Sequence, residues 1–213
     1  MTYAEQSIAE FLGNVASKQV TPAGGSAAAV SGAIGASLCE MVCIHTVGGG
    51  NGGNTAEESR DFDGAQTLTV VRDELREQRR RLLALADADA EAVDALLSAI
   101  DAEPSSQRGT EATTEQKRAV GVPLAIAEAS LAVLENAVVA VERGNPSAVA
   151  DGVIGAYLSR AALQSALFIV RSNVAGLEDR DFAEEVTDRA AEIEVSAERT
   201  WERIPKATRD SRR

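Results

Sequence analysis

Two aspartates, Asp89 and Asp151, occur at positions where the surrounding helical pattern calls for apolar or small side chains. A carboxylate on a core-facing stripe is costly unless it is paired or hydrogen-bonded, and its pKa tends upward. Carboxyl groups with adjusted pKa values are suited to moving protons. Two such departures in an otherwise regular pattern favour a functional site.

Asp89 lies in an expected long helix over residues 66–101. At 100° per residue it falls at the centre of the apolar stripe, whereas Asp87 and Asp94 project to the opposite, solvated side. The stripe consists of Leu82, Leu85, Ala86, Val93, Leu96 and Ile100. The structural alternative is that Asp89 is a buried hydrogen-bonding partner that fixes the register of the helix.

Asp151 lies in a second expected helix, over residues 146–174, on the side opposite the polar Arg160, Gln164 and Arg171. It is close to the helix start that follows Pro146, where the helix dipole favours negative charge. A simple first-turn charge is therefore the structural alternative for Asp151.

A glycine-containing loop, TPAGG from Thr21 to Gly25, precedes a helix of small residues that we expect from Ser26, as N-cap, to about residue 46. Gly24 and Gly25 are free to adopt positive φ and allow a ligand close to the backbone. The free N–H groups of the helix start can bind a carboxylate or a polarised oxygen. Tight helix packing is the alternative; it explains Gly32 and Gly35 well and the loop less well.

The remaining pattern predicts an all-α protein with a single bundle of about six helices and long central helices. We expect the bundle to span residues 1–199 and residues 200–213 to form a tail without a core to join. The other expected helices cover residues 4–17, 114–143 and 181–198. Pro123 is expected to kink or restart the helix over residues 114–143. Loops that are polar or rich in glycine are expected over residues 48–54 and 102–113.

The net charge of −12 excludes partners that need a basic surface, such as nucleic acid and anionic membranes. Lysine occurs only at Lys18, Lys117 and Lys206, and the other cations are arginine. This composition fits an organism with high internal salt, with an ordinary acidic protein as the alternative.

Neither a metal site nor a membrane span is expected. Cys39 and Cys43 share a helix face, but His45 points elsewhere, and a zinc site needs about four convergent ligands. The apolar segments 27–44 and 152–170 carry Glu40 and Arg160, so they fit central helices of a soluble, cytoplasmic bundle better than membrane spans.

Five motifs, in order and spacing over about residues 7–177, resemble the formiminotransferase-cyclodeaminase family, which includes stand-alone methenyltetrahydrofolate cyclohydrolases. They are TPAGGSAAA (21–29), DADAEAV (87–93), VPL (122–124), GNPSAVADGVIGA (144–156) and IVRSN (169–173).

The resemblance implies a helical dimer or larger homo-oligomer that acts on tetrahydrofolate carrying a one-carbon unit, without a metal or redox cofactor. It implies that Asp89 transfers protons and that Asp151 is either its partner or a group that holds the pterin ring nitrogens. Substrate-binding residues would be Pro22, Gly24, Gly25, Ser26, Asn145, Arg171 and Asn173. Arg171 would bind the folate glutamate carboxylates or simply be a solvated charge.

Three departures from the family pattern stand out. Ala23 replaces a glycine, the family's lysines after the second helix are missing from residues 48–54, and Ile169 stands in place of an asparagine. A cyclohydrolase is slightly favoured over a cyclodeaminase because no formiminotransferase region is present. The competing hypotheses are a non-catalytic helical oligomer that binds folate or another partner through the same cleft, and an acidic scaffold without a small-molecule site.

Overall fold

The computed structural model describes residues 2–47, 58–101 and 106–204, and within these ranges every regular element is helical. The elements are η1 (Tyr3–Glu5), α1 (Ile8–Val15), α2 (Gly24–Val47), α3 (Glu58–Asp101), α4 (Ser106–Arg143), η2 (Pro146–Ala148), α5 (Val149–Val174) and α6 (Arg180–Trp201). The expected all-α class with long central helices is confirmed.

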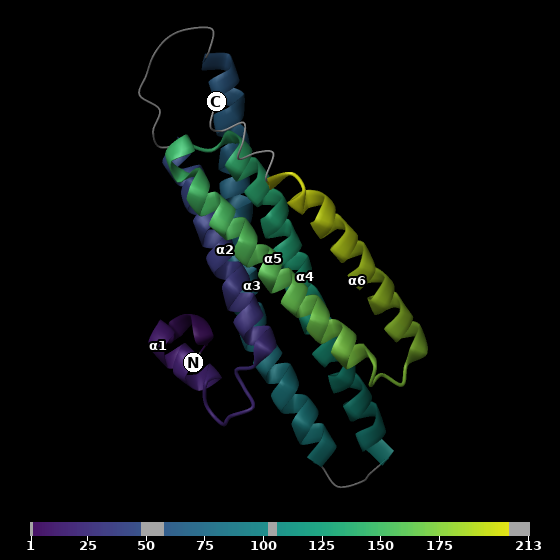
Figure 1. Cartoon of the computed structure of the whole chain (residues 1–213). Coiled ribbons are helices and arrows are strands. Elements are labelled where there is room, and N and C mark those ends of the chain that lie inside the picture. The colour runs from purple at the N-terminus through teal and green to yellow at the C-terminus, as the bar shows by residue number, and fades with distance from the viewer. Residues whose placement is uncertain (1, 48–57, 102–105, 205–213) are drawn as a thin grey trace.

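Four long helices form the bundle, and each packs against two neighbours in the order α2, α3, α4, α5 and back to α2. Helix α6 lies along α4 and α5, and η1 contacts α3, so that the short N-terminal segment sits beside the bundle (Figure 1). Consecutive helices run antiparallel. The start of α2 is therefore level with the end of α5.

Local sequence signals fix several helix ends. Ser7 caps α1 in a reciprocal capping box with Glu10, and Asp179 caps α6 by accepting from the Phe182 N–H at 3.1 Å. The Asn145 side chain caps η2 by accepting from the Ser147 N–H at 2.9 Å. Side-chain acceptors thus replace the partners that helix starts lack.

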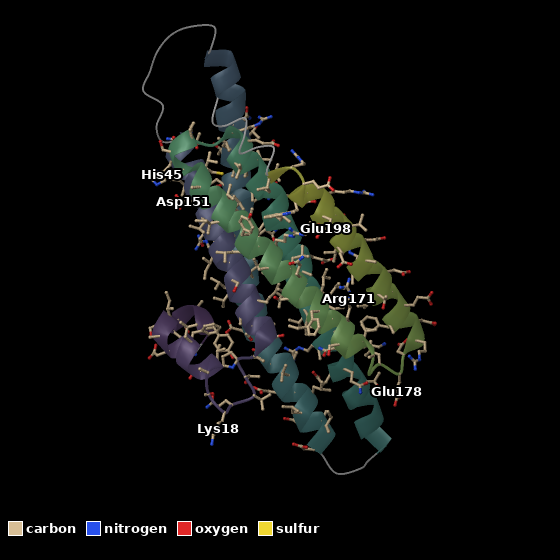
Figure 2. All side chains as sticks on the ribbon, viewed as in Figure 1. Lys18, His45, Asp151, Arg171, Glu178 and Glu198 are labelled. Carbon is tan, nitrogen blue, oxygen red and sulfur yellow. The ribbon has the colours of Figure 1, made fainter. Side chains whose placement is uncertain are left out.

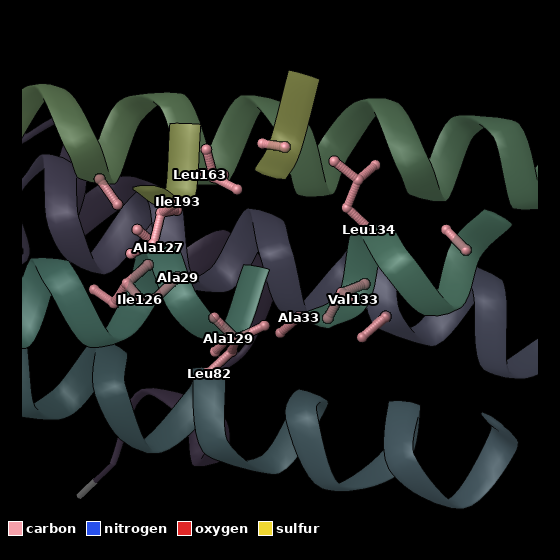
Figure 3. Close-up of a cluster of buried hydrophobic side chains, with 14 of the residues drawn as sticks. Ala29, Ala33, Leu82, Ile126, Ala127, Ala129, Val133, Leu134, Leu163 and Ile193 are labelled. Atoms are coloured by element: carbon pink, nitrogen blue, oxygen red, sulfur yellow. The ribbon is translucent and has the colours of Figure 1, made fainter. Parts of the chain in front are cut away.

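The core is built from small side chains that let the helices approach closely. A Cβ on Gly35 of α2 would lie 2.5 Å from Ser159 Oγ and 2.7 Å from the Gly155 carbonyl of α5, so no larger residue fits there. Figure 3 shows alanines of α2 and α4 among larger side chains such as Leu82 and Leu163. The packing explanation for Gly35 is confirmed.

Several element boundaries differ from those expected. Ser26 is not the N-cap of α2, because α2 begins at Gly24 and Ser26 is fully buried inside its first turn. Helix α3 begins earlier, at Glu58, and α4 begins at Ser106, so most of the expected loop over residues 102–113 is helical. Pro123 lies inside a helix that continues past it. The expected glycine-rich loop over residues 48–54 lies outside the described residues.

The expected boundary between bundle and tail at residue 199 is placed too early. Thr200 and Ile204 are buried, and the Trp201 ring packs edge-on against Tyr157 at 4.8 Å and beneath the Arg160 guanidinium at 4.5 Å. Aromatic and cation–π contacts therefore fasten the end of α6 to α5. Residues 205–213 lie outside the described residues.

Three helices, α2, α4 and α5, are long and apolar enough to cross a membrane by length and composition alone. About half of each apolar window is buried inside the bundle. The only acidic residue of α2, Glu40, is buried and accepts from Arg76 at 2.9 Å and Arg79 at 3.1 Å, both on α3. Its charge is thus matched within the fold, as a buried carboxylate requires.

Candidate active site at the start of helix α2

Asp89 of α3 faces the first turn of α2 and is only 4% exposed. The Ser26 hydroxyl lies 3.0 Å from Asp89 Oδ2 and 2.9 Å from the Ala86 carbonyl, and the Ser26 backbone N–H also donates to Asp89. The hydroxyl has one proton, so it donates to one of these acceptors at a time. When it donates to Ala86, its oxygen can accept a hydrogen bond from the protonated Asp89 carboxyl, so Ser26 can serve both protonation states of the acid.

Gly25 makes this close approach possible. A Cβ built on Gly25 would overlap the Asp89 carboxylate, contacting its carbon and both oxygens. The glycine is required by proximity and not by backbone conformation, because neither Gly24 nor Gly25 has positive φ. The expectation of positive φ in this loop is therefore wrong, and Ala23 needs no unusual conformation either.

Burial raises the pKa of the Asp89 carboxyl above its usual range, and the two hydrogen bonds from Ser26 oppose that rise without cancelling it. An acid with a raised pKa holds its proton to a higher pH than an ordinary aspartate does. Asp89 is thus suited to accept a proton in one step and to return it in another.

A small polar pocket of about 280 Å³ lies on the same stretch of α3, between that helix and the N-terminal segment. The Asp87 carboxylate accepts from the Tyr3 backbone N–H at 2.7 Å, and Asp94 accepts from the Thr21 hydroxyl at 3.2 Å. Burial and then the charges of Asp87, Asp94 and Asp89 raise the pKa of the Tyr3 phenol. Tyr3 therefore lies within electrostatic reach of all three acids.

Asp87 and Asp94 were expected on a solvated side. Asp94 is exposed as expected, whereas Asp87 is half-buried against the N-terminal segment. Tyr3 and Thr21 are pocket residues that the sequence analysis missed. The spacing of Asp87, Glu91 and Asp94, at i, i+4 and i+7 on one helix face, is the signal that could have pointed to a second acidic surface.

Asp151 does not meet Asp89 within one chain. It sits in the first turn of α5, and the neighbouring Gly152 packs against Val42 and accepts a weak bond from the Cys39 thiol at 3.7 Å. Asp89 instead contacts residue 25, which lies about 25 Å from Val42 along α2. In Figure 2, Asp151 lies toward the same end of the bundle as His45, and Lys18, just before α2, lies toward the other end.

Two other predicted binding residues have partners within the fold. Asn145 caps η2, and its backbone N–H donates to the Thr46 hydroxyl at 2.8 Å, so it lies at the Asp151 end of the bundle. Arg171 forms an exposed ion pair with Glu194 of α6 at 2.6 Å. Of the two alternatives for Arg171, this geometry favours the solvated charge.

Asn173 supplies the hydrogen bond that Pro123 cannot make within α4. A proline inside a helix has no N–H to donate to the carbonyl four residues earlier, and for Pro123 that carbonyl belongs to Ala119. The Asn173 side-chain amide of α5 donates to the Ala119 carbonyl at 2.9 Å. The last residue of the IVRSN motif thus bonds the carbonyl that the proline of the VPL motif leaves without its helical donor.

The rest of the predicted loop surrounds the start of α2. Pro22 is buried and follows a cis peptide bond, whereas Gly24 is exposed. The Ile169 side chain of α5 lies next to Gly24, 3.9 Å from where a Cβ would be. Pro22, Gly24, Gly25 and Ser26 are therefore brought together with Asp89, while Asp151 and Asn145 are not.

Among the residues that the structure describes, no three His, Cys, Asp or Glu side chains converge in a way that could hold a metal ion. Cys39 and Cys43 are buried free thiols, and burial raises the pKa of Cys39 to about 12 and that of Cys43 to about 11. Both are therefore thiols at neutral pH, which is not the form that binds metals.

Comparisons with known proteins identify the family of the chain. Residues 7–192 match the model of the formiminotransferase-cyclodeaminase family. The chain is 34% identical over 185 residues to a methenyltetrahydrofolate cyclohydrolase of Methylorubrum extorquens, covering 84% of this chain and 85% of that protein. Its fold matches the crystal structure of a formiminotetrahydrofolate cyclodeaminase from Thermotoga maritima, with a TM-score of 0.84, 24% identity and 97% of both chains covered. The chain belongs to the formiminotransferase-cyclodeaminase family.

Proposed function

We propose that this protein is an enzyme of one-carbon tetrahydrofolate metabolism that hydrolyses 5,10-methenyltetrahydrofolate to 10-formyltetrahydrofolate. The observation that carries the proposal is the buried Asp89, with its raised pKa, held against the first turn of α2 by Ser26. Membership of the family and the 34% identity to a cyclohydrolase support the choice of reaction.

The reaction requires three proton movements close to a single carbon. Water loses a proton as it adds to the cationic methenyl carbon, and N5 gains a proton as its bond to that carbon breaks. The hydroxyl left on the carbon loses its own proton to solvent as the formyl carbonyl forms, so that one proton is released overall. Asp89 takes the proton that water loses on addition and supplies the one that N5 gains, because its raised pKa lets it hold a proton more readily than an ordinary aspartate does. The reaction itself needs no metal and no redox cofactor.

The backbone around Asp89 holds the substrate. The first N–H groups of a helix lack partners within it and carry the positive end of the helix dipole. At α2 these groups belong to residues that include the exposed Gly24, where a folate oxygen can approach without a side chain in the way. In this proposal Pro22, Gly24, Gly25 and Ser26 bind the pterin side of the substrate.

The cyclodeaminase reaction is the second candidate. There N10 of 5-formiminotetrahydrofolate attacks the formimino carbon and ammonia leaves, so Asp89 would protonate the departing nitrogen. The fold match to a cyclodeaminase favours this candidate only at the level of architecture. The two reactions use the same acid and differ in the substrate supplied.

We also propose that the protein works in the cytoplasm, at high salt, as a homodimer or larger homo-oligomer, without nucleic-acid or membrane partners. The net charge of −12 and the scarcity of lysine support work at high salt, and the negative charge supports the lack of nucleic-acid and membrane partners. The burial of about half of each apolar helix window supports a water-soluble bundle. Exposed apolar side chains such as Phe168, at 74%, support association.

The test follows the near-ultraviolet absorbance of 5,10-methenyltetrahydrofolate with purified protein in low-salt and high-salt buffer. We expect a decay faster than in buffer alone and fastest at high salt. A parallel reaction with 5-formiminotetrahydrofolate, monitored for ammonia, separates the cyclohydrolase from the cyclodeaminase. Rates equal to buffer with both substrates would refute the enzyme, and a folate-binding titration would then separate a folate-binding oligomer from a scaffold.

A further inference from the structure

Helices α3 and α4 continue past the level at which α2 begins and α5 ends. Gly25, in the first turn of α2, touches Asp89, and α3 runs on from there to Asp101. Asn173, the next-to-last residue of α5, bonds to the Ala119 carbonyl, and α4 has already run through several turns before that residue. Figure 1 shows the end of α3 and the start of α4 projecting together beyond the other two bundle helices.

The projecting part of α3 keeps an apolar side in the direction of α2. Leu82 and Ala86, which precede Asp89 on this side, are fully buried in the core. After Asp89, four apolar residues lie within about 80° of it around the helix. They form what we call the α3 apolar face: Val93, Leu96, Leu97 and Ile100. Leu97 is 39% and Ile100 52% exposed, because α2 does not reach this far.

The segment that precedes α2 runs along another side of α3. The Thr21 hydroxyl bonds to Asp94, which lies about 140° from Asp89 around the helix. Gly24 is exposed at the start of α2, and the Ile169 side chain of α5 lies 3.9 Å from its Cβ position. An apolar side chain of α5 and the α3 apolar face therefore both border the end of the bundle at which Asp89 lies.

The chemistry of the substrate identifies what this apolar surface would contact. In a one-carbon folate, the reacting carbon is bonded to N10 once the ring is closed, and N10 is bonded directly to the benzene ring of the benzoyl group. With bond lengths of about 1.4 Å, the ring atoms lie about 3–6 Å from that carbon. A catalytic carboxylate acts from about 3 Å, directly or through one water. The uncharged benzene ring therefore lies about 6–9 Å from the Asp89 carboxyl group.

Only one direction along α3 has room for the ring. Toward the start of the helix, Ala86 and Leu82 are fully buried, so a ligand has no access to that surface. Toward the end of the helix, a rise of 1.5 Å per residue places Val93 about 6 Å and Leu97 about 12 Å beyond Asp89. The first half of the α3 apolar face thus lies at the distance from Asp89 that the ring requires. A contiguous exposed apolar surface beside a polar site is typical of ligand binding.

We propose that Val93, Leu96 and Leu97 of α3, together with Ile169 of α5, hold the benzoyl ring of the folate substrate. The identity of the substrate rests on the proposed function. The pterin half lies over the first turn of α2, and the benzoyl half lies on the projecting part of α3. These apolar residues therefore contribute affinity for the substrate, and Asp89 contributes the chemistry. Ile169, which stands where the family pattern has an asparagine, makes the ring-binding surface more apolar.

Calorimetric titration with 5-formyltetrahydrofolate tests the ring-binding surface without turnover. Leu97→Ala and Ile169→Asn are each expected to weaken binding about 10-fold, because each removes apolar contact with the ring. The control is Val70→Ala, a 53% exposed apolar position on α3 that lies about 28 Å from Asp89 and should leave binding unchanged. In methyl-labelled wild type, NMR is expected to show contacts from the benzoyl ring protons to Leu97 and none to the fully buried Leu134.

Binding by Leu97→Ala as tight as that by Val70→Ala would overturn the proposal, as would ring protons that contact methyl groups outside the α3 apolar face and Ile169. A Leu97→Ala variant that loses self-association in sedimentation would assign the face to contact between copies instead. The NMR contacts use the wild type, so they decide the question even if a variant misfolds.

Turnover separates this proposal from the proposed function. With 5,10-methenyltetrahydrofolate, Leu97→Ala is expected to raise KM about 10-fold and to leave kcat unchanged, because it removes binding that the ground state and the transition state share. Turnover with an unchanged KM would refute the ring-binding surface and leave the enzyme. Binding that depends on Leu97, without turnover of either one-carbon folate, would refute the proposed reaction and leave the ring-binding surface. A wild type that neither binds nor turns over these folates would overturn both.

Discussion

Replacing Gly25 by alanine is the sharpest perturbation of the site, because it adds a single carbon against Asp89. The most distant of the three carboxylate atoms would lie 2.6 Å from the new carbon, whereas ordinary contacts begin at 3.4 Å. The carboxyl group or the start of α2 must therefore move by about 1 Å. Overpacking of this kind costs about 1–3 kcal/mol, and a 1 Å displacement of a catalytic group can lower the rate about 100-fold.

Gly121→Ala is the matched control, since a Cβ there meets nothing within 4 Å and Gly121 also lies inside a long helix. Alanine stabilises a helix by up to about 1 kcal/mol relative to glycine. Chemical denaturation is therefore expected to show a gain for Gly121→Ala and a loss for Gly25→Ala. The absorbance assay is expected to show full turnover for Gly121→Ala and about 1% for Gly25→Ala.

A double-mutant cycle identifies the clash partner. In an Asp89→Ala background the space is open, so Gly25→Ala should no longer destabilise the protein. The reasoning is refuted if Gly25→Ala behaves like Gly121→Ala, or if its destabilisation is the same with and without the Asp89 carboxylate.

Three further predictions concern the same end of the bundle. Asn173→Ala should lower the free energy of unfolding by about 1–3 kcal/mol, because it leaves the Ala119 carbonyl unpaired. Pro123→Ala should recover part of that loss in denaturation curves, because the residue at 123 then has an N–H for this carbonyl. An Asn173→Ala loss of equal size with Pro123 and with Ala at that position would contradict the pairing. Because the folded state raises the pKa of Asp89, it binds a proton more tightly than the unfolded chain, so stability falls as pH rises from the ordinary pKa of the acid through the raised one. Asp89→Asn should therefore melt higher than wild type at neutral pH, with the gap closing on acidification, and a constant gap would argue against burial as the cause. Arg171→Ala removes an exposed ion pair worth about 0–1 kcal/mol and should leave the KM for folate unchanged; a large rise in KM would restore it as a substrate ligand.

Helical periodicity predicted the architecture and the burial of Asp89, because both depend on spacing along one helix. It also explained Gly35, where small residues on two helices meet. Periodicity along one helix could not predict the register between two packed helices. Asp89 and Asp151 each face away from the polar side of their helices, but the antiparallel register places them at opposite ends of α2.

The role of Gly25 also depends on a contact between helices that local sequence does not predict. A glycine before a helix is compatible with positive φ, ligand approach or close packing, and only the position of Asp89 on a different helix decides among them. Asn173 is a similar case, because the carbonyl it satisfies is exposed by a proline 50 residues earlier in the sequence. Long-range partners of this kind are not encoded in local pattern.

The most direct test of the central claim, that Asp89 performs the proton transfer, is a comparison of kcat and KM for 5,10-methenyltetrahydrofolate between wild type, Asp89→Asn and Asp73→Asn. Asp73 lies on the same helix, exposed and paired with Arg72 at 2.9 Å, and serves as the control. We predict that Asp89→Asn lowers kcat by at least 100-fold with little change in KM, and that Asp73→Asn changes neither. An Asp89→Asn variant that turns over at the wild-type rate would contradict the account.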